Sequence, residues 1–250
     1  MASLVNKRKQ RFRKNVLLVM SLLFPIVYYY LSPYLIIMGA SEGVVTGSFI
    51  IFSLMFIGSL FFGRGFCAWI CPAGGEQELC SLIRNRRFRI GKIDWIKYFI
   101  WVPWLLFIAI MFYQAGGMKS IDFFYQTYHG ISVYNIESLV LFIMIAGVIA
   151  LLSLTMGRRG FCHTLCWMAP FMIVGRKIGN LIKLPALRLK ANNEKCIHCK
   201  ICSKSCPMSL DVYEMVVGKN LENTECILCG TCIDVCPKNV INYFFNKTSR

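Results

Sequence analysis

The sequence has few charged residues and very few acids. Charged residues make up 16% of the 250 residues, and only 12 are Asp or Glu against 28 Lys or Arg. A disordered chain is excluded because such chains are poor in apolar residues, whereas 56% of this chain is hydrophobic. The low charge content and a mean hydropathy of +0.56 also exclude an ordinary soluble enzyme. An apolar chain with a formal charge of +16 is typical of a membrane protein. A basic chain can also bind nucleic acid, so the positions of the basic residues decide between these two classes.

Histidine is also scarce, which excludes most haem proteins. His129, His163 and His198 all lie outside the apolar runs, whereas a transmembrane haem b normally takes axial histidines inside them. The chain contains no C-x-x-C-H sequence, so a c-type haem is excluded. No A-x-A cleavage site follows the first apolar run, and this argues against a signal peptide.

Four apolar runs are long enough to span a bilayer, which takes about 20 helical residues. They cover residues 15–38, 44–62, 95–113 and 136–156, and their only charged residues, Lys97 and Glu137, lie near their ends. Pro25, Pro33 and Pro103 predict kinks rather than breaks, since neighbouring helices can satisfy the freed carbonyls. The sequence therefore predicts an all-α polytopic membrane domain with four transmembrane helices over residues 15–190, after a basic N-terminal segment at residues 1–14.

The basic residues are distributed unevenly between the predicted loops. Residues 1–14 and 63–94 carry six Lys or Arg each and residues 157–190 carry seven, whereas 114–135 carry only Lys119. Basic loops remain in the cytoplasm, so both termini are predicted to be cytoplasmic in a multi-pass protein of a prokaryotic inner membrane. Because the positive charge lies beside the spans, nucleic-acid binding is excluded.

An internal repeat accompanies the spans. FGRGFCAWICP at residues 62–72 corresponds to MGRRGFCHTLCW at residues 156–167. Each copy follows two predicted spans, which predicts a 2+2 parallel repeat about an axis along the membrane normal, with the two Cys pairs facing each other. The basic stretches that follow, 79–93 and 168–189, fit either amphipathic interface helices or ordinary loops.

Residues 191–250 form a predicted soluble domain that carries two cysteine runs. Each reads C-x2-C-x2-C-x3-C-P, the bacterial pattern that holds [4Fe-4S] clusters and in which the fourth Cys ligates the other cluster. Zinc sites usually pair two C-x2-C units, and a cytoplasmic domain does not keep structural disulfides, so both alternatives are disfavoured. The sequence predicts an α+β ferredoxin-like domain with two clusters, the first on Cys196, Cys199, Cys202 and Cys236, and the second on Cys226, Cys229, Cys232 and Cys206.

Five of the 13 cysteines remain, and four of them form the two C-x3-C pairs. On a helix this spacing places both thiols on one face. The hypothesis is a third iron–sulfur cluster on Cys67, Cys71, Cys162 and Cys166; a redox dithiol pair, another metal site and plain buried cysteines remain as alternatives. Cys80 is left over and is predicted to be inert.

The four spans, the two C-x3-C elements and the dicluster domain resemble the NapH and NosR type of membrane ferredoxin, a group that includes CcoG. Length and element order are most similar to NapH, and the resemblance implies a membrane subunit that oxidises quinol and passes electrons towards periplasmic reductases. One departure is Trp167, which replaces the Pro of the family after Cys166, whereas Cys71-Pro72 is intact.

The leading functional hypothesis is an electron-transfer subunit that connects the quinone pool to a partner ferredoxin or reductase in a complex. The alternatives are an accessory reductase of the CcoG type, acting on a metal or on a partner's cofactor, and a relay from a cytoplasmic donor. No catalytic residue is identified. The candidates for a quinone site are polar residues of the predicted extracytoplasmic loop and arginines of the repeat: Asp122, Tyr125, Tyr128, His129, Arg64, Arg158 and Arg159. The simpler interpretations are an aromatic interface belt for the loop and positive-inside anchors for the arginines.

Overall fold

The protein was analysed as a computed structural model, which describes residues 2–89 and 91–247. Met1 of the predicted N-terminal segment, position 90 of the predicted 79–93 stretch and residues 248–250 of the predicted ferredoxin domain lie outside the described residues. The apolar part contains α1 (Ala2–Leu22), α2 (Phe24–Val27), η1 (Tyr28–Leu31), α3 (Pro33–Glu42), β1 (Val44–Thr46), α4 (Gly47–Phe62), α5 (Gly65–Trp69), α6 (Pro72–Ile83), η2 (Lys92–Trp95), α7 (Ile96–Gln114), β2 (Ser120–Asp122), α8 (Ile136–Met156), α9 (Gly160–Thr164) and α10 (Met168–Leu181). The C-terminal part contains β3 (Ala186–Ala191), η3 (Asn193–Lys195), α11 (Ile201–Ser205), α12 (Val212–Val217), α13 (Thr231–Asp234) and β4 (Ile241–Asn246).

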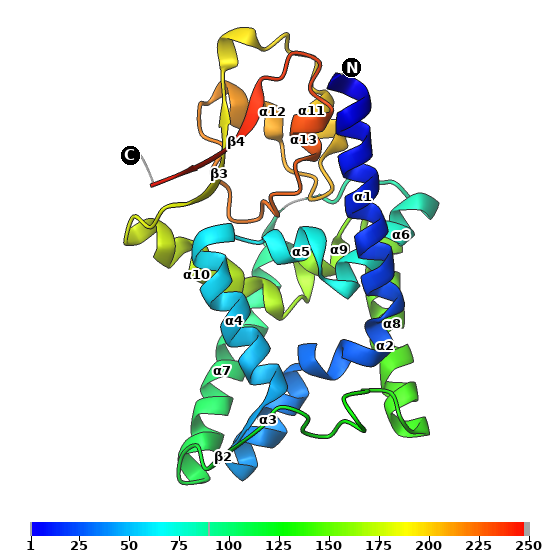
Figure 1. The fold of residues 1–250 in the computed structure, drawn as a ribbon, viewed down its shortest axis with the longest axis vertical. Helices are drawn as coiled ribbons and strands as arrows, with labels where there is room; N and C mark the ends of the chain where they lie inside the picture. The colour runs from blue at the N-terminus through cyan, green and yellow to red at the C-terminus, as the bar shows by residue number, and fades with distance from the viewer. Residues whose placement is uncertain (1, 90, 248–250) are drawn as a thin grey trace.

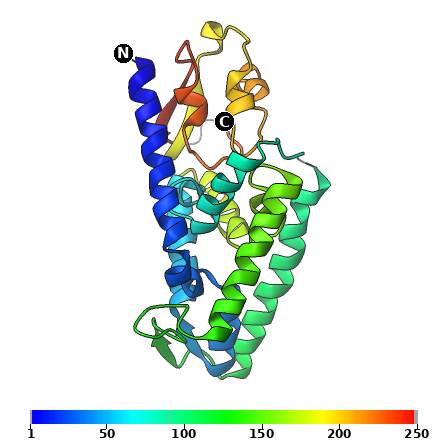
Figure 2. The same cartoon turned by 90° about the vertical axis from the view of Figure 1, so that its right-hand side faces the viewer.

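The molecule has three layers along its longest axis (Figure 1). The long apolar helices form one end, the C-terminal domain forms the other, and the short helices α5, α6, α9 and α10 lie between them. The N-terminus lies beside the C-terminal domain, and the segment around β2 lies at the opposite end (Figures 1 and 2). The predicted cytoplasmic segments thus share one end of the molecule, as the loop charges require.

Two helices are long and apolar enough to cross a membrane, or three if a bent pair is one span. They are Ile93–Gln114 and Ile136–Met156, and only 11% of the most apolar window of each is buried within the protein. The rest of their surface therefore needs an apolar environment, which a bilayer supplies. α4, which covers the predicted run 44–62, has 16 residues and is about 24 Å long, short of the ~30 Å of a hydrocarbon core.

The prediction of kinks rather than breaks is wrong for Pro25 and Pro33. The run 15–38 is divided into α1, α2, η1 and α3, and the axes of Arg8–Leu22 and Phe24–Leu31 differ by 58°. Proline lacks an N–H and fits the first turn of a helix, so Pro25 and Pro33 each lie at the start of a new helix. Pro103 lies inside α7 without ending it.

The repeated unit in the structure consists of one long helix, one short Cys-bearing helix and one amphipathic helix. The first unit is α4–α5–α6 and the second is α8–α9–α10. α10 packs on α4 and α6 packs on α8, so each amphipathic helix contacts the long helix of the other unit. Such reciprocal packing is what a two-fold axis between the units produces. Neither 79–93 nor 168–189 is a single peripheral helix: α6 ends at Ile83, and most of the first three turns of α10 are buried.

Two glycines of α10 allow it to pack closely against α4. A Cβ added at Gly175 of α10 would lie 2.0 Å from Ser59 Oγ and 2.8 Å from Phe56 O of α4, and one added at Gly179 would lie 2.8 Å from Leu60 O. This small-xxx-small spacing lets two backbones approach, as in many membrane helix pairs.

The small sheets complete the fold. β3 and β4 form an antiparallel pair in the C-terminal domain, with Ala186 opposite Asn246 and Ala191 opposite Ile241. The sequence did not predict the parallel pair formed by β1 and β2, which joins Thr46 to Asp122 at the far end of the molecule.

We expect Gly175→Ala to destabilise the protein, because the added Cβ has no room between α10 and α4. Overpacking of this kind costs about 1–3 kcal/mol. Gly147→Ala on α8 is the matched control, since a Cβ there meets nothing within 4 Å. Thermal unfolding in detergent is the measurement; equal melting temperatures for the two variants would contradict the packing described here.

Candidate iron–sulfur sites

The C-terminal domain groups its eight cysteines into the two predicted sets. Cys196, Cys199, Cys202 and Cys236 line one small cavity, and Cys206, Cys226, Cys229 and Cys232 line another. These sets are called the first and second quartets below. The other residues around the second quartet are mainly apolar, among them Leu189, Met208 and Ile227. No group of three or more His, Cys, Asp or Glu side chains among residues 2–89 and 91–247 closes on a single ion-sized point. Four free thiols around one largely apolar space fit the donor set of a [4Fe-4S] cluster.

The four cysteines of the C-x3-C pairs lie together between the long helices and the C-terminal domain. Cys67, Cys71, Cys162 and Cys166, the membrane quartet, are each only 1–2% exposed. The prediction that each pair occupies one helix face is wrong, because α5 ends at Trp69 and α9 ends at Thr164, before the second Cys of each pair.

The two chain segments of the membrane quartet adopt equivalent turns. Cys71 N donates to Phe66 O and Cys166 N donates to Phe161 O, both at 3.0 Å. The replacement of Pro by Trp167 leaves this turn intact. The Trp167 indole instead donates to Leu31 O at 2.8 Å, which ties the second pair to the interrupted first helix.

The four thiols are close enough to affect one another. A hydrogen bond between the Cys166 and Cys162 thiols, with the charges of Arg159 and Arg64, holds the pKa of Cys162 well below its usual value despite burial. Burial, together with the neighbouring Cys67 and Cys162, raises the pKa of Cys71. A site that already favours one thiolate and crowds four sulfurs is suited to a multivalent cationic centre, which binds thiolates.

Two buried arginines face this quartet. Arg64 and Arg159, related by the repeat, are 1% and 2% exposed. Arg159 Nη1 donates to Cys67 O at 3.0 Å. Three other guanidinium nitrogens, Arg64 Nε, Arg64 Nη2 and Arg159 Nε, are buried and have no hydrogen-bond partner among residues 2–89 and 91–247. Unpaired buried donors are rare, and here they lie beside sulfur atoms whose negative charge they can stabilise.

Each arginine is held by one carboxylate. Arg64 Nη1 lies 2.5 Å from Glu225 Oε2, and Lys97 Nζ lies 2.6 Å from Glu225 Oε1. Arg159 Nη2 lies 3.2 Å from Glu78 Oε2, and Arg13 also pairs with Glu78 at 3.0 Å. Burial alone would raise the pKa of Glu225, but Arg64 and Lys97 lower it to about 2. Glu225 directly precedes Cys226, so the Arg64–Glu225 ion pair holds the second quartet next to the layer that contains the membrane quartet.

The two halves of the membrane quartet have different neighbours at equivalent positions. Gln77 Nε2 donates to Cys162 Sγ at 3.1 Å, whereas Cys67 Sγ lies 3.9 Å from Met172 Sδ. Hydrogen bonds to sulfur tune the reduction potential of iron–sulfur centres. The repeat thus provides one polar and one apolar side.

His163 forms a second connection between the layers. Its side chain is fully buried, with Nδ1 2.9 Å from Asp94 Oδ1, Nε2 3.1 Å from Met208 O, and its ring stacked on Phe88. His163 directly follows Cys162 of the membrane quartet, and Met208 is two residues after Cys206 of the second quartet. The hydrogen bond between them therefore connects the two quartets. The roles of His163, Glu78 and Glu225 were not predicted from the sequence. His163 and Glu225 are adjacent to ligand-type cysteines and Glu78 is seven residues from one, and acids are rare in this chain, with only 12 in total. These positions were the available signal.

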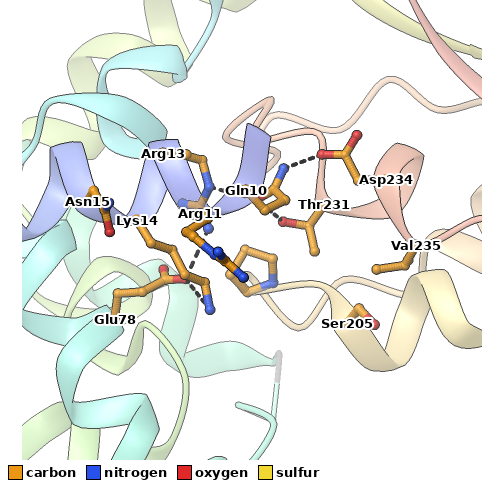
Figure 3. Close-up of a pocket in the computed structure, with 11 residues that line it drawn as sticks. Gln10, Arg11, Arg13, Lys14, Asn15, Glu78, Ser205, Thr231, Asp234 and Val235 are labelled. Atoms are coloured by element: carbon orange, nitrogen blue, oxygen red, sulfur yellow. Dashed lines mark hydrogen bonds and ion pairs between the residues drawn. The ribbon is translucent and has the colours of Figure 1, made fainter. Parts of the chain in front are cut away.

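A polar cavity of about 510 Å³ lies where α1 meets the C-terminal domain (Figure 3). Gln10 Nε2 donates to Cys229 O at 3.0 Å and to Asp234 Oδ2 at 2.5 Å, and Arg13 of the same helix reaches Glu78. The N-terminal helix therefore contacts the second quartet directly and is more than a membrane anchor.

The predicted quinone-site residues do not form one site: Arg64 and Arg159 lie at the membrane quartet, and the four residues of the loop lie elsewhere. Asp122, Tyr128 and His129 are exposed at the end remote from the cysteines, with Tyr128 packed edge-on against His129. Tyr125 lies in the same segment and is half-buried. Arg158 is half-buried and donates to Lys204 O at 2.7 Å, unlike its neighbour Arg159. These placements favour the aromatic-belt interpretation for the loop, and separate Arg158 from the two buried arginines.

Comparisons with known proteins agree with the sites. Residues 195–241 match the 4Fe-4S dicluster domain family, and residues 44–91 and 138–185 each match the same 4Fe-4S binding domain family. The second family thus covers both C-x3-C pairs with their flanking helices. The chain is an iron–sulfur protein whose ferredoxin-type domain is joined to helices able to span a membrane.

One of its relatives is named for electron transport and another as a ferredoxin-type protein. The chain is 25% identical over 76% of its length to YccM of Escherichia coli (strain K12), a protein named for electron transport, and covers 54% of that protein. It is 25% identical over 59% of its length to the methylamine utilization ferredoxin-type protein MauN of Methylobacillus flagellatus, covering 50% of it. Over 29% of its length it is 36% identical to NirI of Paracoccus denitrificans, covering 11% of it. The chain thus spans about half the length of YccM and of MauN. No solved structure matches it.

We expect Glu225→Gln to destabilise the protein by about 3 kcal/mol, because it leaves Arg64 and Lys97 buried without a counter-charge. Glu194→Gln is the control, since Glu194 is exposed in the same domain and forms no ion pair within the described residues. Denaturant unfolding followed by cluster absorbance measures the difference. Equal stability of both variants would show that the carboxylate is dispensable.

Proposed function

We propose that the protein is the membrane-bound iron–sulfur subunit of an electron-transfer complex, and that it carries electrons between the quinone pool and a protein partner. The observation that carries this proposal is the stacking of the membrane quartet against the second quartet, joined by Arg64–Glu225 and by His163–Met208. The similarity to YccM, which is named for electron transport, and to the ferredoxin-type protein MauN supports it. NapH-type quinol oxidation is the finer form of the proposal, with both termini on the cytoplasmic side and four membrane passes provided by α1–α3, α4, α7 and α8.

The membrane quartet is proposed to hold a third iron–sulfur cluster. The 4Fe-4S binding family matches both C-x3-C segments, and the thiols are buried and adjacent to two cationic side chains. When bound, a cluster supplies a one-electron carrier at the membrane edge. Arg64 and Arg159 hold positive charge beside it, and the apolar surroundings exclude water.

The proposed route leaves the protein at the first quartet. Cys199 is exposed, whereas Cys206, Cys229 and Cys232 of the second quartet are buried. The exposed lysines Lys195, Lys200, Lys204 and Lys238 flank the first quartet along the chain. This surface suits an acidic redox partner, because opposite charges increase association rates.

Burial of the membrane quartet weighs against the accessory-reductase alternative. That function requires the C-x3-C thiols to touch copper or a partner's thiols, and these thiols are 1–2% exposed. Electrons can cross such a barrier, whereas a metal ion or a protein thiol cannot reach through it.

Purified protein is expected to contain about 12 iron atoms per chain if three four-iron clusters are present. A Cys67→Ser/Cys162→Ser variant should lose about four of them and one EPR signal while keeping the two ferredoxin signals. Eight iron atoms in the unmodified protein, with four titratable thiols, would remove the third cluster from the proposal.

Arg159→Gln is expected to shift the midpoint potential of the membrane cluster to more negative values, because the reduced cluster loses a nearby positive charge. Arg158→Gln is the matched control: it is the adjacent residue, but it bonds to Lys204 O outside the quartet. EPR-monitored redox titration measures both. Equal shifts in the two variants would contradict the assignment of Arg159.

A further inference from the structure

An apolar groove of about 480 Å³ runs along α4 to the layer of short helices. One wall is formed by Leu54, Gly58 and Phe62 of α4, the other by Phe66 and Ile70, and Leu228 of the C-terminal domain lies at its end. Leu54 and Phe62 are 58% and 56% exposed, so the groove opens on the outer face of the helix that the bilayer would cover. No charged residue lines it.

The groove adjoins two cysteine quartets at once. Phe66 and Ile70 directly precede Cys67 and Cys71 of the membrane quartet, and Leu228 directly precedes Cys229 of the second quartet. A molecule in the groove is therefore one residue away from the ligands of two separate one-electron carriers. The polar cavity beside α1 also adjoins cysteine ligands, but charged side chains line it and it does not suit an apolar molecule.

We propose that the α4 groove binds the ring of an isoprenoid quinone or quinol, with the tail leaving along α4 into the bilayer. This inference rests on the proposed function, and it locates the quinone within the structure. The site differs from the one predicted in the loop 114–135, which lies at the end of the molecule remote from the C-terminal domain (Figure 1). The occupant must be apolar because the walls of the groove are apolar. It must be redox-active because the groove adjoins two proposed electron carriers.

The electron count agrees with the geometry. A quinol gives up two electrons and two protons to become a quinone. If clusters are bound at the membrane quartet and the second quartet in their oxidised state, each would take one electron, and the two protons of the quinol would pass to solvent.

Trp69 supplies the one indole N–H in the groove. It lines the wall formed by α5 and has no hydrogen-bond partner within the described part of the chain. It is therefore available to a quinone carbonyl. Trp69 is half-buried, and a single donor to a carbonyl orients a ligand in an otherwise apolar site.

Gly58 provides a way to fill the groove without disturbing the fold. A Cβ added there meets nothing within 4 Å, and the same is true of Gly147 on α8, which lies outside the groove. Gly58→Leu places a side chain in the space that the quinone ring would occupy. Gly147→Leu makes the same change on another apolar helix.

The first measurement is reduction of the clusters in the full-length, cluster-loaded protein by a short-chain quinol, with dithionite reduction as a check that all clusters are intact. We expect Gly58→Leu to slow the quinol-driven rate by about tenfold or more, where a factor of ten corresponds to ~1.4 kcal/mol. Gly147→Leu should react like the unmodified protein. Normal quinol reduction in Gly58→Leu would overturn the groove while leaving the proposed function standing.

The second measurement is photochemical labelling with an azido-quinone, which does not depend on electron transfer. We expect label on peptides from residues 47–70, displaced by excess unlabelled quinone, weakened by Trp69→Phe and lost in Gly58→Leu. Label in residues 114–135, or label at 47–70 that quinone fails to displace, would overturn the site, the latter indicating a lipid chain. Displaceable label at 47–70 without quinol reduction would keep the site and overturn the proposed function.

Discussion

The arrangement of this protein depends on burying positive charge beside sulfur at the edge of the apolar layer. Arg64 and Arg159 reach the membrane quartet from the two halves of the repeat, and neither is solvated. A buried charge without a partner costs several kcal/mol, so each needs a carboxylate from another element. Glu225 comes from the C-terminal domain and Glu78 from α6. The position of the C-terminal domain is thus linked to the electrostatics of the quartet beneath it.

This constraint also orders the cysteine sites. Glu225 and Leu228 belong to the loop that carries the second quartet, and Met208 follows Cys206, so all three contacts hold the second quartet towards the membrane layer. The first quartet is more open to solvent, because its Cys199 is exposed. The three sites therefore form a graded series from the apolar layer to solvent. Gln77 and Met172 add a difference within the membrane quartet that two identical repeats could not provide.

Much of this was predictable from local pattern. The cysteine spacing predicts the two ferredoxin quartets because three ligands share one short loop and the fourth must come from the other run. Hydropathy alone predicts α7 and α8 closely. The interrupted first run was not predicted, because whether a proline kinks or ends a helix depends on what packs around it. The burial of Arg64 and Arg159 could not be predicted either: positive-inside counting treats Arg158 and Arg159 alike, and only the fold places Glu78 beside the second.

The reciprocal packing of the two repeat units has a consequence for biosynthesis. Cys67 and Cys71 are synthesised 95 residues before Cys162 and Cys166, and the contact of α6 with α8 can form only after α8 has been made. The first quartet likewise waits for Cys236. During translation the early thiols of each quartet must therefore stay reduced and unpaired until the last cysteine of that quartet has been made, and the membrane quartet is complete about 70 residues before the first quartet.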